Sequence, residues 1–430
     1  MMLKIVVLAV LVSTACSKPG VLNKDDEFST EELIRYFGVE NHAEAPEYEV
    51  VYPLVVDADS KRSVGNGAIA ASFLELEVEA FGETLILNVD HDDSNYAPGL
   101  EVEIYTDEGI QRVPLRTDCV YTGKVAGEQN SIASVTTCDG LMAVIFRNDG
   151  RGELYIEPLE DKHAAKRDVG RGHPHVAYKN RPQKGGAFCS AIDPPVLPIS
   201  SLADPPIMPI SAEEPVDTES TKYLELAFIA DPSYTSSRGS TSSATTCVNT
   251  LFNAVKNVLQ LSSLRGTALV PKLVYVKIFG ATETGLTSNT DSNTYLATCR
   301  AWQHTNNKPS SSSEHWDNAA FFTGVDISSP DAGNAVLGVG YVSGCDYWGA
   351  SLSEFRSLDA TAVTAHEIGH NLGMYHDSSG PEGGPYNSCS SKGYLMAAYN
   401  DNHQKDLGWS TCSRSYYDTR ITQTTCYNDA

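Results

Sequence analysis

The feature that most constrains this chain is a run of eleven residues in which three histidines stand at fixed spacing: HEIGHNLGMYH, from His366 to His376. The apolar pattern from about residue 359 to residue 372 predicts a helix through its first part. Residues four apart on a helix share a face, so His366 and His370 present both imidazoles to one point. Gly373 permits the positive φ at which a chain can leave a helix. The turn brings back His376, and we expect three imidazoles around one ion.

Three neutral imidazoles suit Zn²⁺ and leave a fourth position open to water, which is typical of catalytic zinc sites. Zinc lowers the pKa of such a water from ~15.7 towards ~7. Glu367 follows the first histidine directly, so its carboxylate can reach the water without binding the metal. It can take the proton as general base and pass it to a leaving amine. The pattern predicts a zinc hydrolase; a degenerate, silent site is the alternative, and Glu367 argues against it.

The first residues predict export from the cell. Lys4 precedes the apolar run Ile5–Val12, and small residues follow, so we expect a signal peptide over residues 1–17, cleaved after Ala15 or Ser17. The protein is then secreted and extracellular. A formal net charge of −24 disfavours nucleic-acid binding. The absence of an apolar run of ~20 residues argues against a membrane span.

A proline-rich acidic segment, residues 193–217, divides the chain. It holds seven of the 21 prolines, five acids and no basic residue, which predicts an extended linker. Short alternating runs over residues 18–192 predict a mostly β region. Strands alternate with helices over residues 218–430, which predicts a three-layer α/β domain.

The spacing His-Glu-x-x-His-x-x-Gly-x-x-His resembles the metzincin zinc pattern, and Asp377 after the third histidine resembles the adamalysin or reprolysin branch. Met396, in the segment YLMAA, resembles the methionine turn of that family. The opening strand TKYLEL at residues 221–226 and the propeptide segments between residues 119 and 159 are also similar. The resemblance implies a metzincin fold with a mixed sheet and a long zinc-binding helix. In it Asp377 and Met396 support the site from below.

The same resemblance implies a zymogen whose own propeptide blocks the cleft, and a monomeric endopeptidase that cuts extracellular polypeptides. Within the family, the chain resembles venom metalloproteases of the scorpion antarease-like kind. A catalytically silent binding protein on the same scaffold and a different zinc hydrolase are the alternatives. The segment GVGYV at residues 338–342 resembles the edge strand beside the cleft, which favours an extended polypeptide as substrate.

The ten cysteines fall into several groups. Two in the strand-rich region predict a local disulfide, Cys119–Cys138. Six in the C-terminal half allow fifteen pairings, among which spacing cannot choose. The family resemblance implies Cys345–Cys426 and Cys389–Cys412, which leaves Cys247–Cys299.

Two further metal roles stay open. A thiolate is a good zinc ligand, so Cys189 could occupy the water position and silence the zymogen, although the flanking residues usual in the family are not evident. Pairing of Cys189 with Cys16 or with another chain is the alternative. The resemblance also implies a structural Ca²⁺ whose ligands would be Glu225, Asp317 and Asn428 or the neighbouring Asp429. The alternative is that the carboxylates at the strand ends are simply solvated.

Overall fold

The structure is a computed structural model. It describes residues 28–57, 60–65, 69–147, 151–165, 172–179, 189–192, 221–265, 268–281, 285–329, 334–342, 346–355, 357–377, 388–390, 393–397, 408–421, 424 and 426–427. Several predictions concern residues outside these ranges: the signal peptide, the linker, Cys16, Cys345 and Asn428.

Most described strands before the predicted linker belong to one antiparallel sheet, and the short alternating runs had predicted a mostly β region. The bounds are α1 (Thr30–Phe37), β1 (Tyr48–Val51), β2 (Leu54–Asp57), β3 (Ser60–Ser63), β4 (Phe73–Ala80), β5 (Glu83–His91), β8 (Val120–Val125), β9 (Ile132–Thr136), β10 (Met142–Arg147), β11 (Gly152–Pro158), α2 (Asp161–Ala165) and β12 (His175–Lys179). The strand order is β1-β12-β11-β10-β9-β8-β5-β4-β2-β3. Along β4 every second residue is buried, which is the period of a strand with one covered face. A turn at Phe81 and Gly82, both with positive φ, connects β4 to β5.

The second sheet is mixed, as predicted, and it uses strands from both sides of the linker. The bounds are β6 (Glu101–Thr106), β7 (Gly109–Pro114), β13 (Cys189–Ile192), β14 (Lys222–Ala230), β15 (Leu269–Phe279), β16 (Asn318–Thr323), β19 (Gly338–Tyr341) and β20 (Ala350–Glu354). The order is β13-β19-β20-β16-β14-β15-β6-β7, with only β19–β20 and β6–β7 antiparallel among the described pairs. Both ends of this sheet therefore come from residues that precede the linker.

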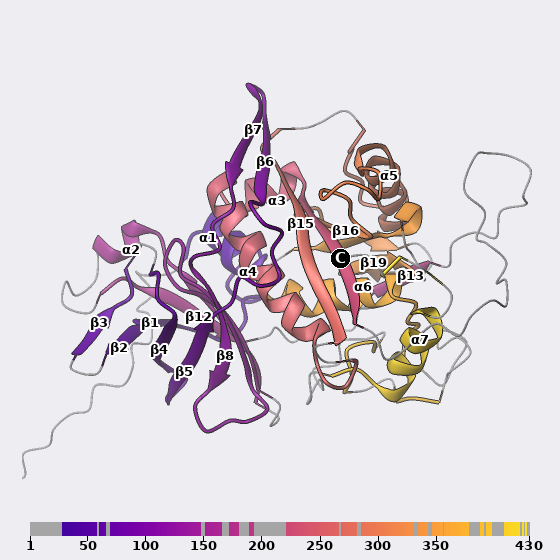
Figure 1. The fold of residues 1–430 in the computed structure, drawn as a ribbon. Helices are drawn as coiled ribbons and strands as arrows, with labels where there is room; N and C mark the ends of the chain where they lie inside the picture. The colour runs from indigo at the N-terminus through magenta and orange to yellow at the C-terminus, as the bar shows by residue number, and fades with distance from the viewer. Residues whose placement is uncertain are drawn as a thin grey trace, which may run out of the picture.

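Helices cover both faces of the second sheet (Figure 1). Leu226 and Phe228 of β14 share a core cluster with α4 (Thr241–Leu259) and α6 (Ala360–Asn371). Ala227 and Ile229 face the other way, into a cluster with α5 (Ser292–Asn306). The remaining elements are α3 (Pro232–Ser237), β17 (Ser328–Ser329), β18 (Asn334–Ala335), the 3-10 turn η3 (Asp346–Trp348) and α7 (Thr411–Ile421). This is the predicted three-layer arrangement.

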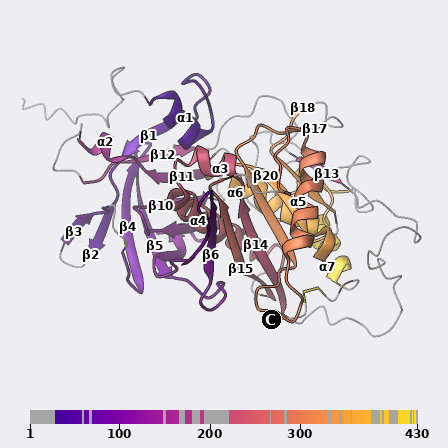
Figure 2. The ribbon, with the colours of Figure 1, turned by 90° about the horizontal axis from the view of Figure 1, so that it is seen from above.

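Helix α4 also contacts the first sheet, so it lies between the two sheets (Figure 2). Its buried Asn253 donates from Nδ2 to the backbone oxygens of Tyr121 and Val135, at 2.8 and 3.2 Å. A buried amide without partners is costly, so these bonds fix how the two parts pack together.

The disulfides agree with the sequence only in part. Cys119–Cys138 and Cys389–Cys412 are present. Cys426 is disulfide-bonded, and its predicted partner Cys345 lies outside the described residues. The predicted pair Cys247–Cys299 is wrong, because both thiols are free and buried. Cys247 lies on α4 and Cys299 on α5, on opposite faces of the sheet, so the two sulfurs cannot meet.

Candidate metal centre and active site

Helix α6 carries the first two histidines of the predicted site in a fully buried position. His366 and His370 are both 0 % exposed, one helical turn apart on one face. Gly373 has a φ of 95°, in the left-handed region, and its N–H donates to the carbonyl of His370 at 2.8 Å. This is the exit from the helix that the sequence predicted, and it returns His376 to the same point.

The three imidazoles converge through their Nε2 atoms. His366 Nε2 lies 3.1 Å from His370 Nε2, which lies 3.2 Å from His376 Nε2. The Nδ1 atoms of His366 and His370 each lie 2.7 Å from a backbone oxygen, of Leu395 and Met374 respectively. Carbonyl oxygens only accept, so both Nδ1 atoms carry the proton and both Nε2 atoms present lone pairs. Lone pairs facing each other at 3.1 Å are stabilised by a cation between them.

The donor set fits zinc. Two nitrogens bound at 2.0–2.1 Å to one tetrahedral ion lie about 3.3 Å apart, close to the spacing found here. The Sγ of Cys189, on β13, lies 3.3 Å from His370 Nε2. It and the ligand atoms of the three histidines all lie within 4.8 Å of one another, and all four residues are buried. The described residues thus place three imidazoles and one thiol around a single point.

Burial determines the protonation states of the three histidines and Cys189. It lowers the pKa of His366 to about 3 and that of His376 to about 4, and it also lowers the pKa of His370. The imidazoles are therefore neutral at physiological pH, the form that binds metal. Burial, with the neighbouring Glu367, raises the pKa of Cys189, so the thiol keeps its proton unless a metal ion binds it.

Glu367 lies in a slot between α6 and strand β19. A Cβ on Gly338 would come within 2.4 Å of Glu367 Oε1, and a Cβ on Gly340 within 2.9 Å of the Glu367 backbone oxygen. Oε2 accepts from the Cys189 thiol at 3.2 Å, whereas Oε1 has no hydrogen-bond partner among the described residues. Burial raises the pKa of Glu367. The sequence predicted the edge strand that carries these two glycines but not the room they leave for Glu367, although Gly-x-Gly inside a strand is a signal for close approach.

Asn371, the last residue of α6, ties this helix to the sheet and was also missed. Its Nδ2 donates to the carbonyl of Tyr341 on β19 at 2.8 Å and to that of Ala350 on β20 at 3.1 Å. Its Oδ1 accepts from the side chain of Asn318. These bonds fix the position of the histidine helix relative to the edge strand.

The structure places Met396 and Asp377 next to each other and Met396 beside the histidine helix. Met396 is 0 % exposed, and its backbone oxygen accepts from the N–H of Asp377 at 2.7 Å. Asp377 is buried and accepts from Ser410 Oγ at 2.5 Å. Burial, partly offset by this bond, raises the pKa of Asp377 to about 6. The segment holding Met396 also supplies the Leu395 carbonyl that orients His366, so this segment contacts one of the three histidines directly.

Replacing Gly369 with alanine tests how tightly helix α6 packs against Met396 and Trp409. A Cβ there would lie 2.7 Å from the sulfur of Met396 and 2.9 Å from the ring of Trp409. In an exposed helix the change would stabilise by roughly 0.5–1 kcal/mol. Here we expect a loss of about 1–3 kcal/mol, because overpacking dominates. Urea unfolding of the intact chain measures it; an unchanged or higher midpoint would contradict the packing described.

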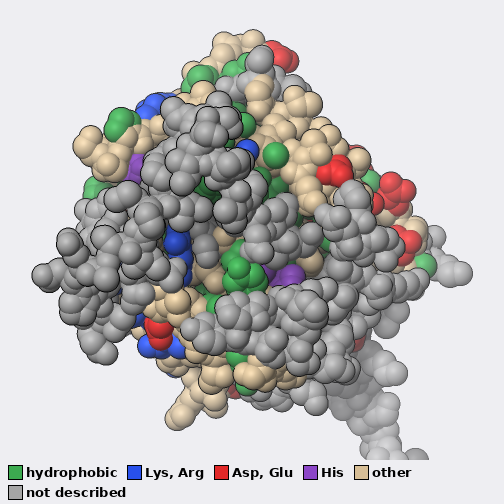
Figure 3. Space-filling model, turned by 90° about the vertical axis from the view of Figure 1, so that its right-hand side faces the viewer, with side chains coloured by type: hydrophobic (Ala, Val, Ile, Leu, Met, Phe, Trp, Pro, Cys, Tyr) green, Lys and Arg blue, Asp and Glu red, His purple; other side chains and the backbone are tan. Residues whose placement is uncertain are grey.

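Strand β13 forms the edge of the second sheet next to the histidine site. It pairs with β19 in parallel, Cys189 opposite Gly338 and Ile192 opposite Tyr341. Figure 3 views the molecule from this side, and a small area of histidine is visible in it beside hydrophobic side chains. The segment before the linker therefore lies across the metal site in the uncut chain.

Two of the three predicted calcium ligands lie together, away from the zinc site. The N–H of Glu225 donates to Asp317 Oδ2 at 2.9 Å, and the N–H of Asp317 donates to the Glu225 carbonyl at 2.9 Å. The third, Asn428, lies outside the described residues. Both bonds involve the backbone of Glu225, so among the described residues they do not by themselves form a calcium site.

Comparison with known proteins identifies both parts of the chain. Residues 220–409 match a model described as metallo-peptidase family M12, reprolysin type, and residues 49–126 match the reprolysin family propeptide. The chain carries a reprolysin catalytic domain and its propeptide. The fold and the buried histidine helix of the reprolysin domain agree with this assignment.

The curated relatives of this reprolysin chain are named as metalloproteinases. The human protein "A disintegrin and metalloproteinase with thrombospondin motifs 10" is 28% identical over 419 residues, 86% of this chain and 36% of its own length. The rat protein "A disintegrin and metalloproteinase with thrombospondin motifs 1" is 26% identical, over 79% of this chain and 38% of its own. The chain thus spans well under half the length of these relatives.

One solved structure, titled "Structure of a chaperone-substrate complex", aligns over 48% of this chain and 36% of its own at 14% identity. Its TM-score of 0.31 is too low to inform the fold.

Proposed function

We propose that this chain is the zymogen of a secreted zinc endopeptidase, in which His366, His370 and His376 hold the metal and Glu367 is the general base. The observation that carries the proposal is the convergence of three Nε2 atoms beside a buried carboxylate, that of Glu367, which is not needed as a metal ligand. When bound, zinc would supply a Lewis acid that polarises the scissile carbonyl and acidifies a water.

The residues of the chain then perform the proton transfers. Glu367 takes a proton from the attacking water and delivers it to the leaving amine. Burial raises the pKa of Glu367, which makes its carboxylate a stronger base than an exposed one. Gly338 and Gly340 leave the room in which the carboxylate is held. Asp377 and Met396 keep the ligands in place from below.

An extended polypeptide is the substrate class that the sheet edge supports. Strand β19 borders the metal site, and an added strand can bind there through main-chain hydrogen bonds. The segment Cys189–Ile192 uses this edge in the uncut chain, so it competes with substrate. We further propose that Cys189 closes the zinc site until the propeptide leaves, which is supported by its distance to His370 Nε2.

The test of this function is proteolysis that depends on metal. The processed protein, freed of its propeptide, is expected to hydrolyse casein, to lose activity on removal of metal by a chelator, and to regain it with zinc. A silent binding protein would keep its zinc and cut nothing across a broad peptide library. Another kind of zinc hydrolase would act on small esters or amides but not on the polypeptide. Either result would overturn the endopeptidase proposal.

Several finer assignments belong to the same proposal. Secretion is supported by the predicted signal peptide, residues 1–17. Among the described helices, none is long and apolar enough to cross a membrane. A structural calcium bound by Glu225 and Asp317, a monomeric state and a role as a venom enzyme stay predictions from the sequence resemblance.

A further inference from the structure

The propeptide lies at both edges of the catalytic sheet, and only one of these edges borders the zinc site. Strand β13 pairs with β19 at the cleft, whereas the β6–β7 hairpin extends the opposite edge, beside β15 (Figure 1). Strands β20, β16 and β14 lie between the two edges, so the two contacts are separate. The second contact plays no part in the chemistry proposed above.

Backbone pairing at the far edge is long. Val102–Tyr105 pair in parallel with Val276–Phe279. The chain before β6 continues the contact: Ala97 N–H donates to the carbonyl of Leu273, and Leu273 N–H donates to that of Asn95, each at 2.9 Å. Residues 95–105 thus follow β15 over most of its length and satisfy an edge that would otherwise be open.

A buried ion pair adds specificity to this contact. Lys277 on β15 lies 2.9 Å from Glu103 on β6, and the two side chains are 3 % and 11 % exposed. The ammonium also lies 4.8 Å from the ring centre of Phe279 and 5.3 Å from that of Trp302. A strand bound at this edge therefore needs a carboxylate opposite Lys277, because a buried charge without a partner is costly.

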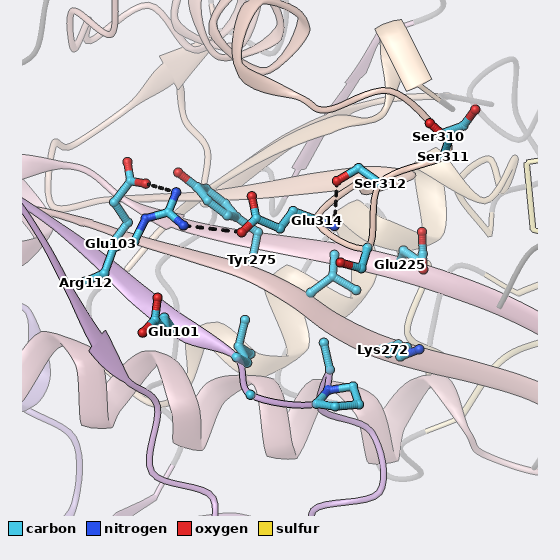
Figure 4. A pocket seen from close by; sticks show the side chains of 16 residues that line it. Glu101, Glu103, Arg112, Glu225, Lys272, Tyr275, Ser310, Ser311, Ser312 and Glu314 are labelled. Atoms are coloured by element: carbon cyan, nitrogen blue, oxygen red, sulfur yellow. Dashed lines mark hydrogen bonds and ion pairs between the residues drawn. The ribbon is translucent and has the colours of Figure 1, made fainter.

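The hairpin is tied to the catalytic domain by further polar contacts. Arg112 on β7 lies 3.1 Å from Glu103 and 3.3 Å from Glu314, which follows the linker in sequence (Figure 4). These side chains line a cavity of about 400 Å³ between the hairpin and the catalytic domain. Asn95 is buried and donates from Nδ2 to the carbonyl of Pro271 at 2.7 Å. The contact has the charge complementarity and the buried hydrogen bonds of a specific interface.

We propose that the β15 edge is a second propeptide-binding site, independent of the cleft, which retains the propeptide on the catalytic domain after the linker has been cut. This inference rests on the proposed zymogen function. Its occupant is the segment of residues 95–114 of this chain. Cutting residues 193–217 then gives a two-chain latent complex, and activity appears only when the propeptide leaves both edges.

The experiment places a specific protease sequence in the linker of the full chain, cuts it, and follows release of the propeptide by size-exclusion chromatography. We expect the cut fragments to elute together and peptide hydrolysis to stay near the uncut level. Retention alone also follows from the contacts between α4 and the first sheet, so variants carry the test. Glu103→Lys should speed release about 30-fold or more, because it opposes two positive charges in a buried place. Adding Lys277→Glu should restore much of the retention.

Glu101→Lys is the matched control, since it makes the same charge change on the same strand at an exposed position. Equal release rates for Glu103→Lys and Glu101→Lys would overturn the proposal, as would immediate release from the cut wild type. If Glu103→Lys does not fold, Asn95→Ala, which removes the bond to Pro271, should still speed release about tenfold. Elution reports release of the propeptide whether or not the catalytic domain is active. If the cut wild-type fragments stay together but the domain released from a variant cuts no peptide, the proposed function is contradicted and the edge site is not.

Discussion

Glu367→Gln in the processed protein is expected to lower kcat for peptide hydrolysis about 10³-fold, within the range that general acid–base catalysis contributes. Glutamine has the same shape and fits the slot beside Gly338 and Gly340, but it cannot accept the proton of the attacking water. Zinc content should stay at one ion per chain, because the three ligands are histidines. Steady-state kinetics and metal analysis on the same sample measure both quantities.

Glu314→Gln makes the same substitution outside the metal site, at a half-exposed residue, and should leave kcat unchanged. A Glu367→Gln protein that keeps its zinc and its wild-type kcat would show that another group moves the proton. A variant that loses its zinc would instead make Glu367 part of the metal site.

Cys189→Ser in the intact, uncut chain is expected to raise hydrolysis of a short peptide substrate about tenfold or more. Serine is a poor zinc ligand, and the loss of even ~1.4 kcal/mol from the closed state shifts its population tenfold. A short peptide is the right probe, because β13 still covers part of the cleft and would exclude a protein. The rate is compared with that of the uncut wild type at equal zinc content.

Cys247→Ser is the matched control, since Cys247 is also a free and buried cysteine but lies on α4. It should leave the uncut chain latent. If Cys189→Ser is as latent as the wild type, the thiol does not hold the site closed, and latency rests on β13 and the rest of the propeptide alone.

Local hydrophobic periodicity was sufficient for much of this molecule. The short alternating runs before the linker predicted a mostly β region, and the alternation of strands with helices after it predicted a three-layer domain, because each pattern reports which side chains are buried within one element. The histidine spacing predicted the metal centre for the same reason, since a helix and one glycine turn bring the three side chains together. The slot formed by Gly338 and Gly340 depends on the neighbouring helix and was not foreseen.

Partners between distant elements could not be predicted in this way. The hydrophobic pattern of a strand does not determine which strand pairs with it, so nothing indicated that β6 and β7 would extend the catalytic sheet. The pairing Cys247–Cys299 failed for a related reason. It was reached by elimination, whereas the faces of α4 and α5 that carry the two thiols are set by the sheet between them. Helices α1 and α7 were also missed; the burial of both depends on contacts with distant parts of the chain.

X-ray absorption at the zinc edge of the intact chain tests the central claim most directly. Three imidazoles and Cys189 predict three nitrogens at about 2.0–2.1 Å and one sulfur at about 2.3 Å. After the propeptide is removed, the sulfur should be lost while the three nitrogens stay. A first shell without three imidazole nitrogens, or an intact chain that binds no zinc at all, would contradict the site described for His366, His370 and His376.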